Sequence, residues 1–379
     1  MTPKERMLAT LRGEAADHIP CAPFFWSSPT TPGYTWRSDE KRLEVVVGKL
    51  GLDAFIPVGL GADWSPEVAV RIWQDHPPGE QHPHLHKEIQ TPAGMLSATV
   101  RRTEDWPHGD DIPLCSDFNV SRYVKPWLET PEDVEKYAHV HVPSGPASIE
   151  AAQRLIEEKR TLADRWQVPL YAGCGLGLTA AIQLFGPERA VLFSMDHPDT
   201  LDRFLDIDHR TTMKRMEALL DLGADIICRN GFYETMDFWS PAQYERHLMP
   251  RLREEIDLVH AAGRTITYTV CTGIMPMLPH LASLDFDGLY SIEPALGHQD
   301  MQAVADTLGG EKCIWGGVSA PIHIGEGTPE TVRHAVRDAV ETFGTHLVLA
   351  AVPSIRAHWP WENVLAMFDE WRRCRDLGV

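Results

Sequence analysis

The sequence lacks long apolar segments, and it has few positive charges relative to its negative ones. No stretch approaches the roughly 18 uninterrupted apolar residues of a membrane-spanning helix, and residues 1–20 contain no apolar core of a secretory signal. Lysine and arginine number 35 against 54 aspartates and glutamates, which gives a net charge of −19. A surface of this sign repels phosphate backbones and anionic lipid headgroups. We therefore expect a cytoplasmic protein that binds neither nucleic acid nor membranes.

Several motifs with a defined chemistry are also absent. The seven cysteines lie far apart and form no CxxC pair, which argues against a disulfide framework or a structural zinc finger. P-loop, GxSxG and HExxH sequences do not occur. The glycine-rich segment 173–177 (GCGLG) lacks the rest of a dinucleotide fingerprint. A glycine-rich rim that leaves room for substrate is favoured over nucleotide binding.

The chain does contain short apolar runs that alternate with long segments of helical periodicity. This alternation is typical of a parallel sheet covered by helices. Eight runs in succession favour a closed (β/α)₈ barrel, although a doubly wound open sheet uses the same alternation. The expected strands are 19–26, 53–58, 168–174, 225–229, 264–271, 288–293, 313–318 and 346–352.

The segment 59–167 interrupts the alternation after the second expected strand. It has clustered proline, glycine and histidine, an alternating run over 94–102 and a helical pattern from Pro131. We predict an α/β fold with one domain over 1–379, a single (β/α)₈ TIM barrel with an inserted β-hairpin and loop region at about 59–167.

Two helices have clear boundaries. Over 241–262 apolar residues recur at spacings of three and four, with Ser240 as N-cap and Gly263 just past the end. A second helix is expected over 328–343, before Gly344.

The first candidate site residues follow the fourth expected strand. In a barrel, reacting groups gather at the C-terminal ends of the strands. Here Asn230, Tyr233 and Glu234 can point into the barrel mouth. Glu234 is the first candidate for a catalytic acid or base, and the alternative is a loop carboxylate paired with a nearby arginine.

The next two strand ends are also polar. Cys271 ends the fifth run just before a glycine-containing turn, where it can ligate a metal, become a thiolate or simply pack. The sixth run leads into Glu293, His298 and Asp300, a loop able to supply metal ligands or an acid/base pair. For Asp300 the alternative role is N-cap of a helix starting near Met301.

Histidines crowd the insertion at positions 76, 82, 84 and 86. Alternation would put His82, His84 and His86 on one face of an extended strand, and three such imidazoles can bind Zn²⁺. The flanking prolines make an exposed loop the favoured interpretation.

Several segments resemble the uroporphyrinogen decarboxylase (URO-D)-like superfamily, which includes corrinoid methyltransferases. They span nearly the whole chain: 1–6 (MTPKER), 17–20 (DHIP), 231–234 (GFYE), 238–241 (FWSP), 315–318 (WGGV) and 360–364 (PWENV). The resemblance implies a (β/α)₈ barrel that performs either decarboxylation or methyl transfer involving a corrinoid protein, tetrahydrofolate or a thiol.

Departures from the family's sequence motifs bear on the choice between decarboxylation and methyl transfer. True uroporphyrinogen decarboxylases have an arginine-rich RQAGR segment after the first strand, whereas this chain has no arginine there before Arg37. In the thiol-methylating branch a His-x-Cys zinc motif falls on Thr269-Val270-Cys271, and its second cysteine falls near Val352 or Pro353. Only Cys271 matches, so the resemblance places this chain nearer the methyltransferases but with an incomplete zinc motif.

The leading hypothesis is a methyltransferase (demethylase) component that moves a methyl group from a small methoxylated or methylated substrate to a corrinoid protein or tetrahydrofolate. The alternatives are a decarboxylase or other lyase acting on a small carboxylated substrate, and a non-catalytic partner of a corrinoid protein. A homodimer is expected as the commonest assembly of soluble enzymes. The candidate residues are Glu234, His298 and Tyr268 for catalysis, Trp26, Asn230, Tyr233 and Arg229 for substrate binding, and Glu234, Cys271, Glu293 and His298 for a Zn²⁺ ion.

Overall fold

Seven parallel strands form one curved sheet at the centre of the molecule. The structure is a computed structural model that describes residues 1–120 and 122–376. The strand order is β1-β8-β9-β10-β11-β12-β13, the sequential neighbour order of a TIM-barrel-like fold. The strands are β1 (Ile56–Val58), β8 (Leu170–Cys174), β9 (Ile226–Asn230), β10 (Thr265–Thr269), β11 (Gly288–Tyr290), β12 (Cys313–Ser319) and β13 (Leu347–Val352).

The segment 19–26, expected as a first strand, is not a regular strand in the structure. It meets the sheet only through isolated parallel bridges, from Cys21 to Leu349 and from Phe25 to Ile355. Pro20 and Pro23 flank Cys21, and proline has no N–H to donate to a strand ladder. The prediction of eight full strands was therefore wrong at this position, and the sheet has seven.

Asp53 ties this N-terminal segment to the start of β1. Its carboxylate accepts hydrogen bonds from the Cys21 backbone N–H at 3.0 Å and from Arg6 Nη1 at 2.5 Å. Asp53 and Arg6 are both buried, and burial raises the pKa of Asp53 against the opposing charge of Arg6. On the other side, the Leu349 N–H donates to Pro20 O at 2.8 Å. The segment thus lies between β13 and β1.

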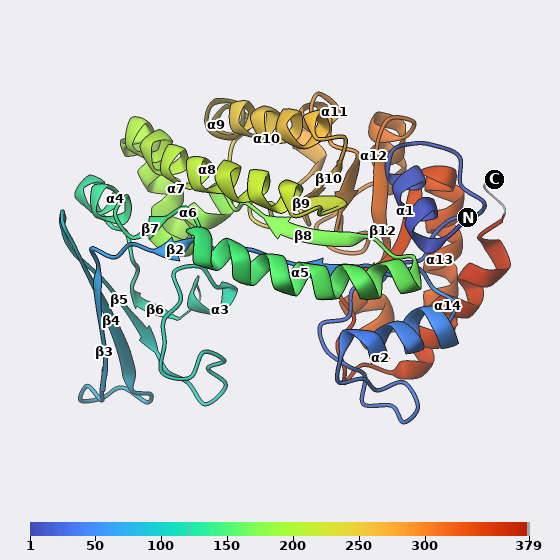
Figure 1. The fold of residues 1–379 in the computed structure, drawn as a ribbon, viewed down its shortest axis with the longest axis horizontal. Coiled ribbons are helices and arrows are strands. Elements are labelled where there is room, and N and C mark those ends of the chain that lie inside the picture. The colour runs from blue at the N-terminus through green and yellow to red at the C-terminus, as the bar shows by residue number, and fades with distance from the viewer. Residues whose placement is uncertain (121, 377–379) are drawn as a thin grey trace.

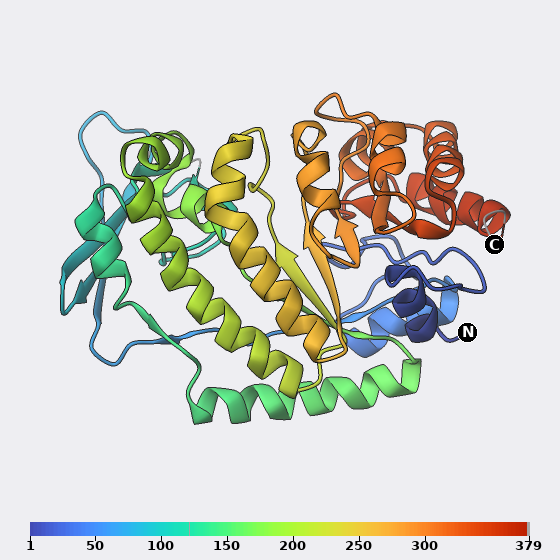
Figure 2. The same ribbon diagram turned by 90° about the horizontal axis from the view of Figure 1, so that it is seen from above.

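Helices cover the outer face of the sheet. In two views α8 and α10 run side by side along strands β8 to β10 (Figures 1 and 2), and among the described residues no helix is long and apolar enough to span a bilayer. The α-helices are α1 (Pro3–Leu11), α2 (Asp39–Leu43), α3 (Asp117–Val120), α4 (Pro131–Tyr137), α5 (Pro146–Trp166), α6 (Leu178–Phe185), α7 (Pro187–Asp196), α8 (Pro198–Asp221), α9 (Pro241–Gln243), α10 (Met249–Ala261), α11 (Leu278–Ala282), α12 (Met301–Leu308), α13 (Pro329–Phe343) and α14 (Trp361–Cys374).

The helix expected over 241–262 is present but interrupted. Ser240 caps it as predicted, but a π-helical turn, η2 (Tyr244–Leu248), separates α9 from α10. Pro250 explains the interruption. Proline has no backbone N–H to donate to the carbonyl four residues earlier, and its ring would clash with that carbonyl in an α-helix. The helix expected over 328–343 is confirmed as α13, with Thr328 as its cap.

The insertion forms a small antiparallel sheet rather than a single hairpin. Its strands run in the order β3-β4-β5-β6 and stand at the end of the molecule away from α13 and α14 (Figure 1). Strands β4 and β5 form a hairpin, and α4 begins at Pro131. The bounds are β3 (Ala69–Asp75), β4 (His84–Thr91), β5 (Gly94–Arg101) and β6 (Tyr123–Lys125), while β2 (Asp63–Trp64) pairs with β7 (His141–Val142).

Aromatic side chains fill the concave side of the curved sheet. Phe24 contacts Phe55, Tyr171, Tyr290 and Trp315, with ring centroids 4.4 to 5.8 Å apart. These residues pack with Met7 and Leu11 of α1 in a core separate from the one beneath the outer helices. Because side chains alternate along a strand, the neighbours of these residues in sequence point toward the outer helices.

We predict that Asp53→Ala destabilises the protein by about 3 kcal/mol, because it leaves a buried guanidinium and a backbone N–H without their partner. Urea unfolding measures the change. The matched control is Glu44→Gln, which removes an exposed ion pair to Lys41 and should change stability by no more than about 0.5 kcal/mol. Equal effects of the two substitutions would show that Asp53 does not tie the N-terminal segment to the sheet.

Candidate functional site

A chain of buried charges lies between β9 and the outer helices. Arg229 Nη2 donates to Glu234 Oε1 at 2.9 Å, and Arg229 Nε donates to Glu255 Oε2 at 2.7 Å. His209 of α8 contacts the other oxygen of Glu255 at 3.2 Å. Arg229, Glu234 and Glu255 are at most 2% exposed. The guanidinium therefore joins the loop after β9 to helices α8 and α10.

Tyrosine and glycine residues complete this arrangement. Tyr268 donates its hydroxyl proton to Glu234 Oε2 at 2.6 Å. A Cβ atom at Gly177 would lie 2.4 Å from Arg229 Nη2, and one at Gly231 would lie 2.3 Å from the Tyr268 ring. Gly177, in the glycine-rich segment, and Gly231 thus leave room for the buried charges.

Burial and neighbouring charges shift the pKa values of Glu234, Glu255 and His209 in different directions. Burial raises the pKa of Glu234 to about 7, against the opposing effects of Arg229 and Tyr268. Although burial opposes it, the charge of Arg229 lowers the pKa of Glu255. Hydrogen bonds to Glu255 and Glu254 likewise outweigh burial and raise the pKa of His209. Glu234 is thus a loop carboxylate paired with a nearby arginine, as the alternative prediction stated. The pair lies behind the sheet, between the sheet and the outer helices, and not in the barrel mouth.

A second polar group lies at the C-terminal ends of β10 to β12. Cys271 Sγ is 3.4 Å from Ser291 Oγ, and Glu293 Oε1 accepts the Ala295 N–H at 2.9 Å. The Ser319 hydroxyl also lies near the Glu293 carboxyl. Gln299 donates to the carbonyl oxygens of Cys271 and Glu293 at 2.9 and 2.8 Å, which holds the two strand ends together. We call Cys271, Ser291, Glu293 and Ser319 the mouth group.

The ionisable members of the mouth group are both held toward their neutral forms. Burial raises the pKa of Cys271 to about 11, although Ser291 opposes this shift. Burial also raises the pKa of Glu293, against the backbone N–H of Ala295 and the hydroxyl of Ser319. The thiol is therefore held neutral, and the equilibrium of the neighbouring carboxyl is shifted toward its protonated form.

The insertion adds a residue that the sequence did not indicate. Asp117 in α3 accepts a hydrogen bond from Gln183 at 2.8 Å, and the Tyr233 hydroxyl lies near its carboxylate. Tyr233 is partly exposed, and its backbone N–H donates to Thr179 at 3.1 Å. No sequence signal marks Asp117, because it follows no expected strand and meets Tyr233 only through the folding of the insertion.

The remaining candidates are spread around the mouth. The Asn230 amide lies against exposed Gly173 of β8. Trp26 is 66% exposed, with Arg356 over its ring at 5.5 Å. His298 lies on an exposed loop with a φ of 53°. Asp300 caps α12 through the N–H groups of Gln302 and Ala303, which confirms the capping role.

The four metal-ligand candidates do not converge. In residues 1–120 and 122–376, three ligand atoms of His, Cys, Asp or Glu approach within 4.8 Å of one another at one place, in the insertion. Glu234 is enclosed by Arg229 and Tyr268, and His298 is exposed. At the positions of the thiol-methylating motif, Thr269 contacts Cys228 and Val352 is an apolar core residue. The residues at the mouth do not fit the family zinc ion.

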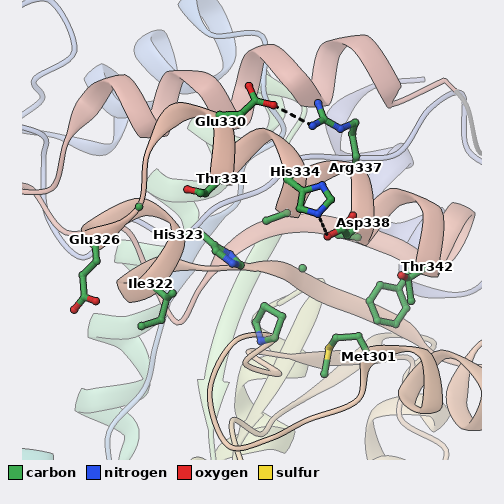
Figure 3. A pocket seen from close by; sticks show the side chains of 16 residues that line it. Met301, Ile322, His323, Glu326, Glu330, Thr331, His334, Arg337, Asp338 and Thr342 are labelled. Atoms are coloured by element: carbon green, nitrogen blue, oxygen red, sulfur yellow. Dashed lines mark hydrogen bonds and ion pairs between the residues drawn. The ribbon is translucent and has the colours of Figure 1, made fainter.

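A separate cavity of about 850 Å³ lies outside the sheet. It is lined by α13, by the start of α12 and by a π-helical turn, η4 (Ala320–Glu326). Figure 3 shows His334 directed at Asp338, 3.4 Å away, and a Glu330–Arg337 pair on α13. None of the predicted site residues lines this cavity. The mouth group, by contrast, lies where strand ends deliver polar side chains.

Residues 116–374 match the uroporphyrinogen decarboxylase (URO-D) family, and the chain belongs to that family.

Two relatives from Methanosarcina barkeri, one of them from strain Fusaro, are methylcobamide:CoM methyltransferases called MtaA. They are 25% and 26% identical over 200 and 202 residues, 53% of this chain and 57% of each relative. The chain thus spans little more than half the length of these curated relatives.

Solved structures show the same fold. A methyltransferase from Methanosarcina mazei superposes with a TM-score of 0.60 and 18% identity, over 98% of this chain and 99% of that one. A B12-independent methionine synthase from Shewanella sp. W3-18-1, in complex with selenomethionine, has a TM-score of 0.50 and 10% identity, over 94% and 98% of the two chains. The α/β barrel-like architecture is therefore shared with methyltransferases.

We predict that the stability difference between the native protein and Glu234→Gln falls as pH rises from about 5 to 7. The folded-state pKa of Glu234, about 7, exceeds its ordinary value of 4.5, so in this range the unfolded chain releases a proton that the folded chain keeps. Rising pH then favours unfolding of the native protein by an amount on the order of 3 kcal/mol. Urea unfolding at several pH values measures both proteins. A difference that stays constant or grows would contradict the burial of this carboxyl.

We also predict slow alkylation of Cys271. With a pKa of about 11, its thiolate fraction at pH 8 is on the order of 100-fold below that of an ordinary cysteine. Iodoacetamide labelling followed by peptide mass spectrometry should show a rate that still rises above pH 9 (roughly the ordinary thiol range). Rapid labelling at neutral pH, on a plateau, would instead identify a stabilised thiolate.

Proposed function

We propose that this chain is a methyltransferase component that takes a methyl group from a small methoxylated or methylated substrate and passes it to a corrinoid protein or tetrahydrofolate. The observation that carries the proposal is the mouth group, which sets the raised-pKa carboxyl of Glu293 beside the Cys271 thiol. Membership of the URO-D family and the methylcobamide methyltransferase relatives support methyl transfer as the reaction.

In this proposal Glu293 is the general acid. The methyl carbon bonds to the nucleophile of the acceptor, the bond from carbon to the substrate oxygen breaks, and Glu293 donates its proton to the leaving oxygen. A raised pKa suits this step because it increases the fraction of the carboxyl that holds the proton the leaving oxygen needs. Cys271 and Ser291 donate or accept hydrogen bonds beside the reacting atoms, and His298 lies on the loop above them.

Substrate contacts come from the residues around the mouth. Tyr233, Asn230 and Trp26 offer aromatic faces and an amide to a flat methoxylated compound. Arg229, Glu234 and Tyr268 act through position, because their buried hydrogen bonds hold the loop that carries Asn230 and Tyr233. Glu234 and Tyr268 are thus positioning residues in the proposal rather than groups that touch the substrate.

Zinc has no step in this mechanism. The proposed ligands Glu234, Cys271, Glu293 and His298 are not gathered, and Thr269 and Val352 do not complete the family set.

A decarboxylase would need a cationic side chain free to bind the carboxylate of its substrate. The guanidinium of Arg229, a substrate-binding candidate, is already paired with Glu234 and Glu255. Carbon dioxide release and binding without turnover are therefore alternative outcomes of the test below.

We expect Glu293→Gln to lower kcat for methyl transfer by about 100-fold with a smaller change in KM, because a general acid contributes mainly in the transition state. The assay supplies methoxylated and methylated small compounds with a reduced free corrinoid, and it follows methylated corrinoid by absorbance and the demethylated product by mass spectrometry. Tetrahydrofolate is tested in parallel. Glu311→Gln, on an exposed turn, is the matched control.

Three results would contradict the proposal. Undiminished turnover by Glu293→Gln would exclude this carboxyl as the acid. Release of carbon dioxide without methyl transfer would identify a lyase. Tight binding of a corrinoid protein, without turnover of any compound and unchanged by Glu293→Gln, would identify a non-catalytic partner.

A further inference from the structure

A second cluster of ligand-type side chains lies in the insertion, far from the mouth group. Asp75 ends β3, and His84 and His86 begin β4. One ligand atom from each of the three lies within 4.8 Å of the other two. Figure 1 shows β3 and β4 at the end of the molecule opposite α13 and α14. No step of the proposed reaction uses these residues.

Strand pairing brings the three side chains to one face. Asp75 stands directly opposite His84 in the antiparallel ladder, and Trp73 stands opposite His86. Because side chains alternate along a strand, His84 and His86 share a face, with ring centroids 6.2 Å apart. Asp75 Oδ1 lies 3.0 Å from His86 Nε2.

The imidazole of His84 is buried and has a ring nitrogen without a hydrogen-bond partner. Its side chain is buried, 7% exposed, and its Nε2 has no hydrogen-bond partner. Glu80 Oε2, from the turn between β3 and β4, lies 3.8 Å away, too far for a hydrogen bond. A buried ring nitrogen without a partner costs free energy, which a bound cation would recover.

Neighbouring residues hold His86 in a ligand orientation. Thr99 of β5 hydrogen-bonds His86 Nδ1 at 3.0 Å, and the Trp73 ring stacks on the imidazole at 4.9 Å with an angle of 8°. A hydrogen bond to one ring nitrogen fixes which nitrogen is free to bind metal, as partners beyond the ligands do in metal sites.

We infer that Asp75, His84 and His86 form a binding site for a divalent transition metal ion, with zinc as the best match. Two imidazoles and a carboxylate are a common zinc ligand set, and a fourth ligand completes the tetrahedron. Glu80 is positioned to supply it by exchanging its contact with Arg101, 3.3 Å away. The ion would fasten the 76–83 turn to both strands and stabilise the insertion.

The test uses the full chain, stripped with chelator and titrated with Zn²⁺ by calorimetry, with Co²⁺ as a spectroscopic substitute. We expect one equivalent to bind, and Asp75→Asn and His86→Gln to weaken binding at least about tenfold. Thr99→Val should weaken it by a smaller factor. Zn²⁺ should raise Tm of the native protein, because a ligand of the folded state stabilises that state, and should raise Tm of the two ligand variants less.

Controls separate this site from other histidines and from the mouth group. His82→Asn changes a histidine of the same turn that lies outside the cluster, and it should bind Zn²⁺ as the native protein does. Cys271→Ser should also keep the equivalent. The Asp75 side chain is 55% exposed, so Asp75→Asn should fold, which circular dichroism checks. Absence of binding, or equal affinity in Asp75→Asn, His86→Gln and His82→Asn, would overturn the inference.

Discussion

The buried guanidinium of Arg229 is the interaction on which the geometry of the site depends. It is 1% exposed and bonds carboxylates from two directions, Glu234 in the loop after β9 and Glu255 in α10. A buried charge is tolerable only with such partners, and removing one of them leaves the other charges uncompensated. The path of the loop after β9 is therefore fixed, and with it the positions of Asn230 and Tyr233 at the mouth.

The polar residues near the strand ends fall into two sets that differ in position. Glu234, Arg229 and Tyr268 lie behind the sheet and hold the loop after β9. Cys271, Ser291, Glu293 and Ser319 lie where parallel strands end. The two sets share a feature, because burial raises the pKa of one carboxyl in each, Glu234 and Glu293. A raised carboxyl pKa therefore does not by itself identify the catalytic group, and the proposal chooses Glu293 by its location.

The sequence predicted the alternation of strands and helices well. It predicted poorly on which side of the sheet each polar side chain lies. Periodicity and capping residues located α13, the Ser240 cap and seven strands, because these signals are local. The segment 19–26 was misjudged because its prolines interrupt the ladder. Glu234 was placed in the mouth because a sequence does not reveal that the loop folds back onto Arg229. Asp117 and Asp75 were missed because their partners, Tyr233 and His84, come near only through the folding and strand pairing of the insertion.

The claim that Glu293, and not Glu234, supplies the reacting proton is tested most directly by the pH dependence of kcat. A general acid must be protonated, so activity should fall as pH rises through its pKa. We predict that this fall persists in Glu234→Gln and disappears in Glu293→Gln, whose residual activity should be nearly independent of pH. The opposite pattern, with the fall lost in Glu234→Gln and kept in Glu293→Gln, would contradict the account.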